Sequence, residues 1–141
     1  MAKLFLGSNE TFTVGANSTA DVYGVTAGNE KVIVTAGAAV TLDQNVERVE
    51  LSGAAASYTY AISGNVVTVK SGTTTVATYI AGNGYKTIAF SDGSATLALT
   101  GLNTATLGGQ AIPATTAAAL TNVTLNAADK SASAALVTPT Y

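Results

Sequence analysis

Short runs of β-branched and aromatic residues, separated by small turn residues, recur along the whole chain and limit what it can fold into. The runs include TFTV, KVIVT, YTYAI, VVTVK, TVATYI, KTIAF and ATLAL, and Gly-Asn, Ser-Gly or Asp-Gly pairs stand between them. Short strands spaced about 8 to 12 residues apart are typical of sandwiches, barrels and solenoids. No window carries a convincing helical period over three turns. The sequence therefore predicts an all-β fold.

The first half of the chain contains a weak internal repeat. Apolar pairs with period-two spacing recur about every 8 to 9 residues, a step that fits one strand and one tight turn of a solenoid. The pairs are Val32 and Val34, Val40 and Leu42, and Val49 and Leu51. Because Glu30–Gly37 and Glu47–Gly53 echo each other, we expect a β-roll or β-solenoid over residues 11–53, with Val32 or Val34 stacked on Val49 or Leu51. A sandwich that produces such echoes by chance is the alternative.

The second half of the chain predicts antiparallel hairpins in a sandwich-like arrangement. Turn sequences stand at Ser63-Gly64-Asn65, Ser71-Gly72, Gly82-Asn83-Gly84 and Asp92-Gly93. Residues 123–127 (VTLNA) form a further candidate strand. We expect a single all-β domain over residues 11–127, preceded by an extended segment at residues 1–10 and followed by a tail at residues 128–141.

The composition argues against several classes of function. Charged residues make up 10% of the chain, its net charge is −2, and its six cationic residues are scattered. Nucleic acid is not an expected partner, because a phosphate backbone needs several cations on one face. Membrane insertion is not expected either, since no apolar stretch approaches the roughly 18 residues of a spanning helix. With no His and no Cys, the usual general bases and thiol nucleophiles are missing, and we expect no enzyme.

Three stretches resemble a known kind of bacterial module. They are NVERVELSGAAASYTYAISGNVVTVKSG at residues 45–72, GNGYKTIAFSDGSATLALTGL at residues 82–102 and ATLGGQAIP at residues 105–113. Their sequences resemble those of β-strand-repeat modules in RTX-associated adhesins and surface-layer-like proteins, which use type I secretion. The resemblance implies an extracellular location, export without an N-terminal signal peptide, and a secretion signal in the tail at residues 136–141. The calcium-binding RTX nonapeptide is absent, because Gly108-Gly109 is not followed by Asp.

Calcium remains the one cofactor to consider, and otherwise none is expected. Asp21, Asp43 and Asn45 carry hard oxygen ligands at turn positions, although no single loop supplies the six or more oxygens that calcium takes. Ordinary turn chemistry, in which such side chains bond their own backbone, is the alternative explanation for these residues.

Self-association is the leading functional prediction. A chain this poor in charge has little to keep copies apart, and an unprotected sheet edge is a template for strand addition. We expect a secreted, non-catalytic subunit that polymerises into a filament, matrix fibre or surface lattice. The segments expected to add to a neighbour's sheet contain Lys3, Leu4, Phe5 and Leu6 at one terminus and Val123 and Leu125 at the other. A monomeric adhesin module that binds calcium, glycan or a cell surface and a viral capsid decoration protein are the alternatives.

Overall fold

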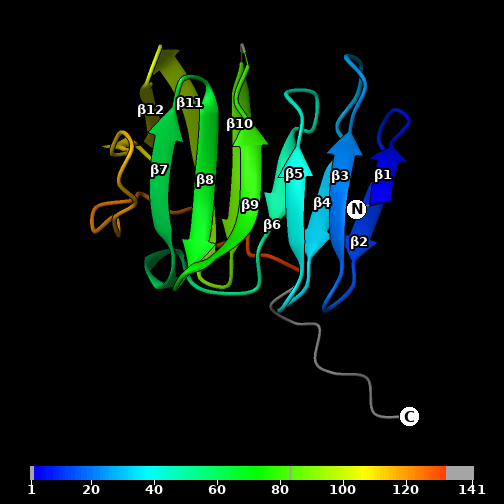
Figure 1. Ribbon diagram of the computed structural model, residues 1–141, viewed down its shortest axis with the longest axis horizontal. Helices are drawn as coiled ribbons and strands as arrows, with labels where there is room; N and C mark the ends of the chain where they lie inside the picture. The colour runs from blue at the N-terminus through cyan, green and yellow to red at the C-terminus, as the bar shows by residue number, and fades with distance from the viewer. Residues whose placement is uncertain (1, 83, 133–141) are drawn as a thin grey trace.

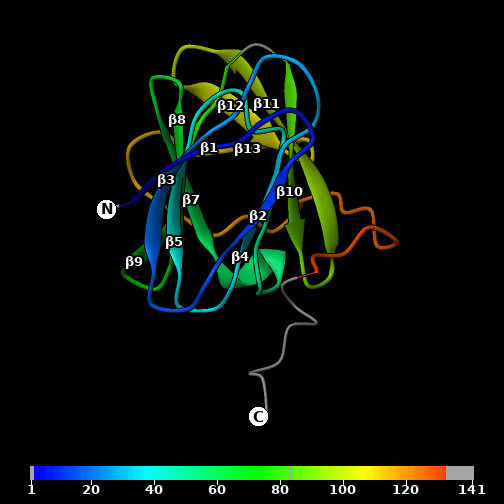
Figure 2. The same ribbon diagram turned by 90° about the vertical axis from the view of Figure 1, so that its right-hand side faces the viewer.

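The computed structural model describes residues 2–82 and 84–132, which form one all-β domain of two facing sheets (Figures 1 and 2). The strands are β1 (Ala2–Phe5), β2 (Thr11–Val14), β3 (Thr19–Tyr23), β4 (Lys31–Val34), β5 (Ala39–Leu42), β6 (Arg48–Glu50), β7 (Thr59–Ser63), β8 (Val66–Ser71), β9 (Thr74–Ile80), β10 (Tyr85–Phe90), β11 (Gly93–Gly101), β12 (Thr104–Leu107) and β13 (Gln110–Ala111). One 3₁₀ turn, Ala55–Ser57, precedes β7.

Each sheet is parallel in one half and antiparallel in the other. Sheet A has the order β1-β3-β5-β9-β8-β7, and sheet B has the order β13-β12-β11-β10-β6-β4-β2. The strands β1, β3, β5 and β9 are parallel neighbours, and so are β2, β4, β6 and β10. The chain therefore alternates between the sheets, and each turn of the solenoid contributes one strand to sheet A and the next to sheet B. We call each such pair a rung, and the four rungs are β1–β2, β3–β4, β5–β6 and β9–β10.

The solenoid prediction for the first half is confirmed. The register of β4 on β6 places Val32 beside Val49, as the echo between the two phrases indicated. Both residues are fully buried between the sheets. The repeat begins earlier than predicted, because β1 in the segment 1–10 already pairs with β3.

Most of the predicted hairpins are also present. The β7–β8 turn joins Ser63 to Val66, the β8–β9 turn joins Ser71 to Thr74, and the β10–β11 turn joins Phe90 to Gly93. Gly64 and Gly72 have φ of 64° and 62°. Both therefore lie in the left-handed region that these tight turns require and that glycine adopts without steric penalty.

The hairpin predicted around Gly82-Asn83-Gly84 is wrong. The strands that flank it lie in different sheets: β9 pairs with β5 in sheet A, and β10 pairs with β6 in sheet B. Packing explains this outcome. Tyr79 of β9 and Ile88 of β10 are both fully buried between the sheets, so each strand extends a different sheet and the pair forms a fourth rung. The β7–β8 hairpin is inserted between the third and fourth rungs.

Period-two alternation sorts the strand residues into an apolar core and a polar exterior. Two tyrosines extend into this core from sheet A, and each finds a backbone acceptor for its hydroxyl. Tyr60 donates to the carbonyl of Ala55 at 2.7 Å, and Tyr79 donates to the carbonyl of Val46. Burial raises the pKa of both phenols above the ordinary value, so both hydroxyls remain donors.

Candidate assembly interface

At one end of the molecule, both sheets finish in an edge strand. β1 is the edge strand of sheet A and β2 is the edge strand of sheet B. Figure 2 shows both strands at the end of the molecule that faces the viewer. In the ranges that the structure describes, each of them is paired on one side only. We call the end formed by β1 and β2 the open end.

The backbone of β1 directs alternate groups away from the molecule. The amide of Leu6, just after the strand, donates to the carbonyl of Tyr23 at 2.8 Å. Because successive backbone groups of a strand alternate in direction, Lys3 and Phe5 present their N–H and C=O groups to the outer edge. These two residues lie within the segment that the sequence predicted for strand addition.

The backbone of β2 has the same property. The carbonyl of Glu10, just before the strand, accepts a hydrogen bond of 3.0 Å from the amide of Lys31 in β4. By the same alternation, Thr11 and Thr13 present their backbone groups to the outer edge. As far as residues 2–82 and 84–132 go, the open end therefore offers two adjacent rows of backbone donors and acceptors that no strand pairs with, one from each sheet.

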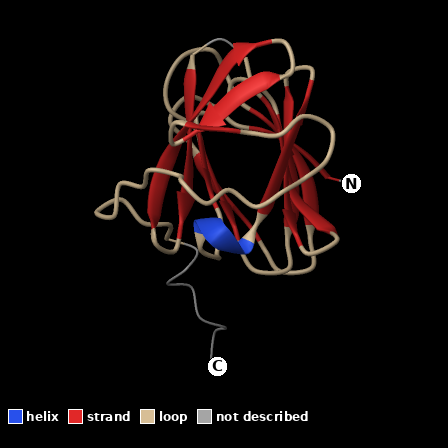
Figure 3. Ribbon diagram, turned by 90° about the vertical axis from the view of Figure 1, so that its left-hand side faces the viewer, coloured by secondary structure: helices blue, strands red, loops and turns tan. Residues whose placement is uncertain are grey.

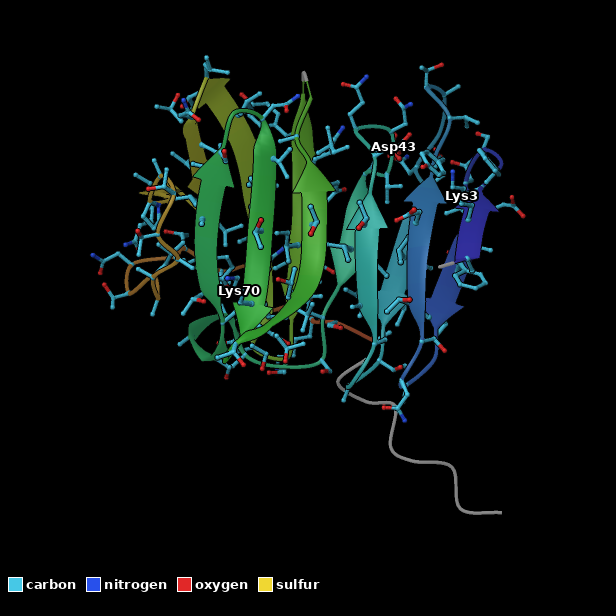
Figure 4. The ribbon with its side chains drawn as sticks, viewed as in Figure 1. Lys3, Asp43 and Lys70 are labelled. Carbon is cyan, nitrogen blue, oxygen red and sulfur yellow. The ribbon has the colours of Figure 1, made fainter. Side chains whose placement is uncertain are left out.

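Apolar side chains accompany these polar rows. Leu4 and Phe12 are half-buried and pack against the core at its open end. Phe5 is 76% exposed and stacks on Tyr23, with ring centroids 5.0 Å apart. Lys3, labelled in Figure 4, is the one charged residue of β1 and β2. It stands in register with Asp21 of β3. Such an edge is weakly defended by charge.

The opposite end of sheet A is covered. Residues 113–118 run along the outer edge of β7, where the amide of Ile62 donates to the carbonyl of Pro113 at 2.9 Å. Tyr60 and Ala118 exchange two further bonds, of 2.9 and 3.1 Å. Figure 3 shows this end of the molecule crossed by loops. We call it the covered end.

The predicted strand at residues 123–127 is replaced at this end by a single bridge. β12 stops at Leu107, which leaves the start of β11 paired with β10 on one side only, and Asn126 fills the other side by exchanging two hydrogen bonds with Ser94. Val123 and Leu125 are half-buried against the core. Of the two segments predicted for strand addition, this one is thus engaged within its own chain, whereas Lys3–Leu6 lies at the open end.

An ionic cluster holds the chain after this bridge to the outer face of sheet B. Arg48 in β6 makes a bidentate contact with Asp129, at 2.8 and 2.9 Å, and bonds Glu50 at 2.7 Å. Glu50 is 3% exposed and also accepts the amide of Ala132 at 2.7 Å. The hydrogen bonds from Arg48 hold the pKa of Asp129 below its ordinary value.

A second set of carboxylates orders the turns at one edge of the solenoid. Glu10, Glu30 and Glu47 precede β2, β4 and β6 at equivalent positions. Glu30 is fully buried and accepts the amides of Val25 at 2.7 Å and Asn9 at 3.3 Å. Glu47 accepts the amide of Glu30 at 2.8 Å. Sequence reasoning gave these residues no role, although Glu30 and Glu47 begin the two echoing phrases, and Glu10 joins the set only when the rungs are aligned.

The residues considered for calcium occupy different settings. Asp21 lies in β3, opposite Thr41. Asp43 lies in the turn after β5 (Figure 4), where its carboxylate accepts the amides of Gly24 at 3.0 Å and Asn45 at 3.1 Å. Among residues 2–82 and 84–132, no group of three or more acidic side chains is arranged to hold a metal ion.

Comparisons with protein-family models, with curated proteins and with solved structures gave no match for this chain. In the described part of the chain, no helix has the length and apolarity needed to cross a membrane. The part of the tail expected to carry a secretion signal, residues 136–141, lies outside the described residues.

Proposed function

We propose that this protein is a non-catalytic structural subunit that assembles with copies of itself by strand addition at the open end. The observation that carries the proposal is the coincidence of two unpaired edge strands, one from each sheet, at one end of a single core. An exposed edge of this kind is a template for another strand. Because β1 and β2 lie together, one partner can extend both sheets at once.

The surface chemistry supports association. Charged residues make up 10% of the chain, against about 25% in a typical globular domain. Low charge leaves little electrostatic repulsion between copies. Phe5, 76% exposed on β1, adds an apolar contact at the proposed surface.

The setting that we propose is extracellular. The resemblance of residues 45–72 and 82–102 to modules of type I-secreted surface proteins supports it, and there the assembly would be a filament, a matrix fibre or a surface lattice. Neither calcium nor another cofactor is needed for pairing, because backbone groups supply the bonds.

Proline at the outward-facing backbone positions tests the proposal. The double variant Lys3→Pro and Thr13→Pro removes two outward N–H groups but leaves the amides that face β3 and β4 in place. We expect association to weaken at least about tenfold, since each lost hydrogen bond contributes on the order of 1 kcal/mol and the proline ring also blocks close approach. Sedimentation velocity across a concentration series measures the change.

The matched control is the double variant Lys3→Ala and Thr13→Ala, which loses the same side chains and keeps both N–H groups. It should associate like the intact chain. Circular dichroism establishes that all three chains are folded. A folded proline variant that associates as strongly as the alanine control would refute strand addition at this end.

A further inference from the structure

We propose that the partner at the open end is the open end of a second copy, joined through a two-fold axis so that β1 pairs with β1 and β2 with β2. The product is a dimer with two continuous sheets, and this dimer would be the building unit of the filament, fibre or lattice, whose growth would use a different contact between dimers. This inference rests on the proposed function, because it assumes association at the open end, and it adds which surface of the partner is used.

The covered end supports this choice of partner. Head-to-tail growth would require β1 and β2 to pair with the opposite end of the next copy. There, the amides of Tyr60 and Ile62 in β7 already donate to Ala118 and Pro113. The chain around Asn126, which pairs with Ser94, continues to the contact between Arg48 and Asp129. Among the described residues, the far edge of sheet A is thus closed to a further strand, so only the open end lets one partner extend both sheets together. Identical surfaces pair through a two-fold axis.

Strand direction and side-chain pattern are compatible with that symmetry. A two-fold axis perpendicular to the sheets reverses strand direction, so each edge strand meets its copy in antiparallel fashion. With the axis at Leu4, the outward groups of Lys3 face those of Phe5 in the second copy. Lysines are then not opposed, which avoids a destabilising like-charge pair.

The same symmetry suits β2. With the axis at Phe12, the outward groups of Thr11 face those of Thr13 in the second copy, and a threonine pair across two strands is favourable. Leu4 and Phe12 are the half-buried apolar residues of the two edge strands, and both pack against the core. In the dimer each would contact its own copy, which joins the two cores.

A cysteine at the proposed axis tests the arrangement, since the native chain has none to interfere. Residues at a non-hydrogen-bonded antiparallel pair have Cα atoms about 4.5 Å apart, within the range that a disulfide spans. The variant Leu4→Cys should therefore form a disulfide-linked dimer in nearly full yield under mild oxidation. Phe12→Cys, a second single variant, should do the same and guards against misfolding of the first.

Leu102→Cys is the control, because Leu102 is 79% exposed in the β11–β12 turn. It should stay largely uncrosslinked. If the intact chain associates but neither Leu4→Cys nor Phe12→Cys gives a homodimer, the two-fold arrangement is wrong and the proposed function stands. A disulfide found only between the two different variants in a mixture would mean that β1 pairs with β2, which also overturns it. If the intact chain is monomeric at every concentration, both proposals fail.

Discussion

Replacing Glu30 with alanine is expected to lower the free energy of unfolding by about 2 to 4 kcal/mol. The Glu30 carboxylate is fully buried and accepts hydrogen bonds from the amides of Val25 and Asn9. A hydrogen bond to a charged group contributes about 1.5 to 3 kcal/mol, and this substitution removes two of them, of which the one from Asn9 is long at 3.3 Å. Chemical denaturation with urea measures the difference directly.

Glu10→Ala provides the matched control for this prediction. Glu10 occupies the equivalent position one rung earlier, and its carboxylate accepts the amide of Gly7, but it is exposed to water that can replace the lost bond. We expect an effect below about 1 kcal/mol. Equal losses in the two variants would show that burial of Glu30 does not determine its contribution.

The second large effect is expected for Arg48→Met, which should lower the free energy of unfolding by about 3 kcal/mol. Glu50, 3% exposed, would keep Lys31 at 3.8 Å and the amide of Ala132 but lose its closest cation. Removing one partner from a buried ion pair is strongly destabilising, because the other charge stays buried. Asp129 is 42% exposed, so its separate contribution is screened by solvent.

The pH dependence of the Arg48→Met effect distinguishes an ionic contribution from lost packing. Because Arg48 lowers the pKa of Asp129 in the folded protein, the stabilisation is present above the ordinary carboxyl value of about 4 and is lost as the pH falls through the lowered value. The difference between intact chain and variant should therefore be largest near pH 7 and shrink below about pH 4. A difference that is the same at pH 7 and pH 3 would contradict an ionic contribution from the pair of Arg48 and Asp129. Thermal unfolding at both pH values measures it.

Local sequence signals sufficed for much of the fold. The alternation in Val32–Val34 and Val49–Leu51 indicated two strands with buried faces. The similarity of the two surrounding segments indicated that these strands stack in successive turns of a solenoid. Gly64 and Gly72 marked hairpins, because a two-residue turn needs the positive φ that glycine adopts readily. These features depend on residues close together in the sequence.

The rest depends on contacts between distant residues. A glycine-rich stretch such as Gly82–Gly84 suits a hairpin and a crossing between sheets equally well, and only the packing of β9 on β5 and of β10 on β6 decides between them. Residues 113–118 carry no clear period, and they cover the outer edge of β7, a strand formed by residues far away in the sequence. Their coverage of β7 was therefore not predictable from local pattern.

The candidate interface was also predictable only in part from local sequence. Low charge predicted an unprotected sheet edge, and of the two segments expected to form it, Lys3–Leu6 lies at the open end. Val123 and Leu125 carry an equally good strand pattern, but they are held within their own chain by the bridge between Asn126 and Ser94. Which of two similar segments remains free depends on what the folded domain leaves unpaired.

Hydrogen exchange of the outward amides of β1 and β2 tests most directly whether another molecule completes these sheets. The amides are those of Lys3, Phe5, Thr11 and Thr13, and they can be followed by nuclear magnetic resonance in dilute and concentrated solutions of the intact chain. We predict that their exchange slows at least about tenfold as concentration rises, while the neighbouring amide of Leu6, already bonded to Tyr23, changes much less. Fast exchange of all four at every concentration would contradict the account.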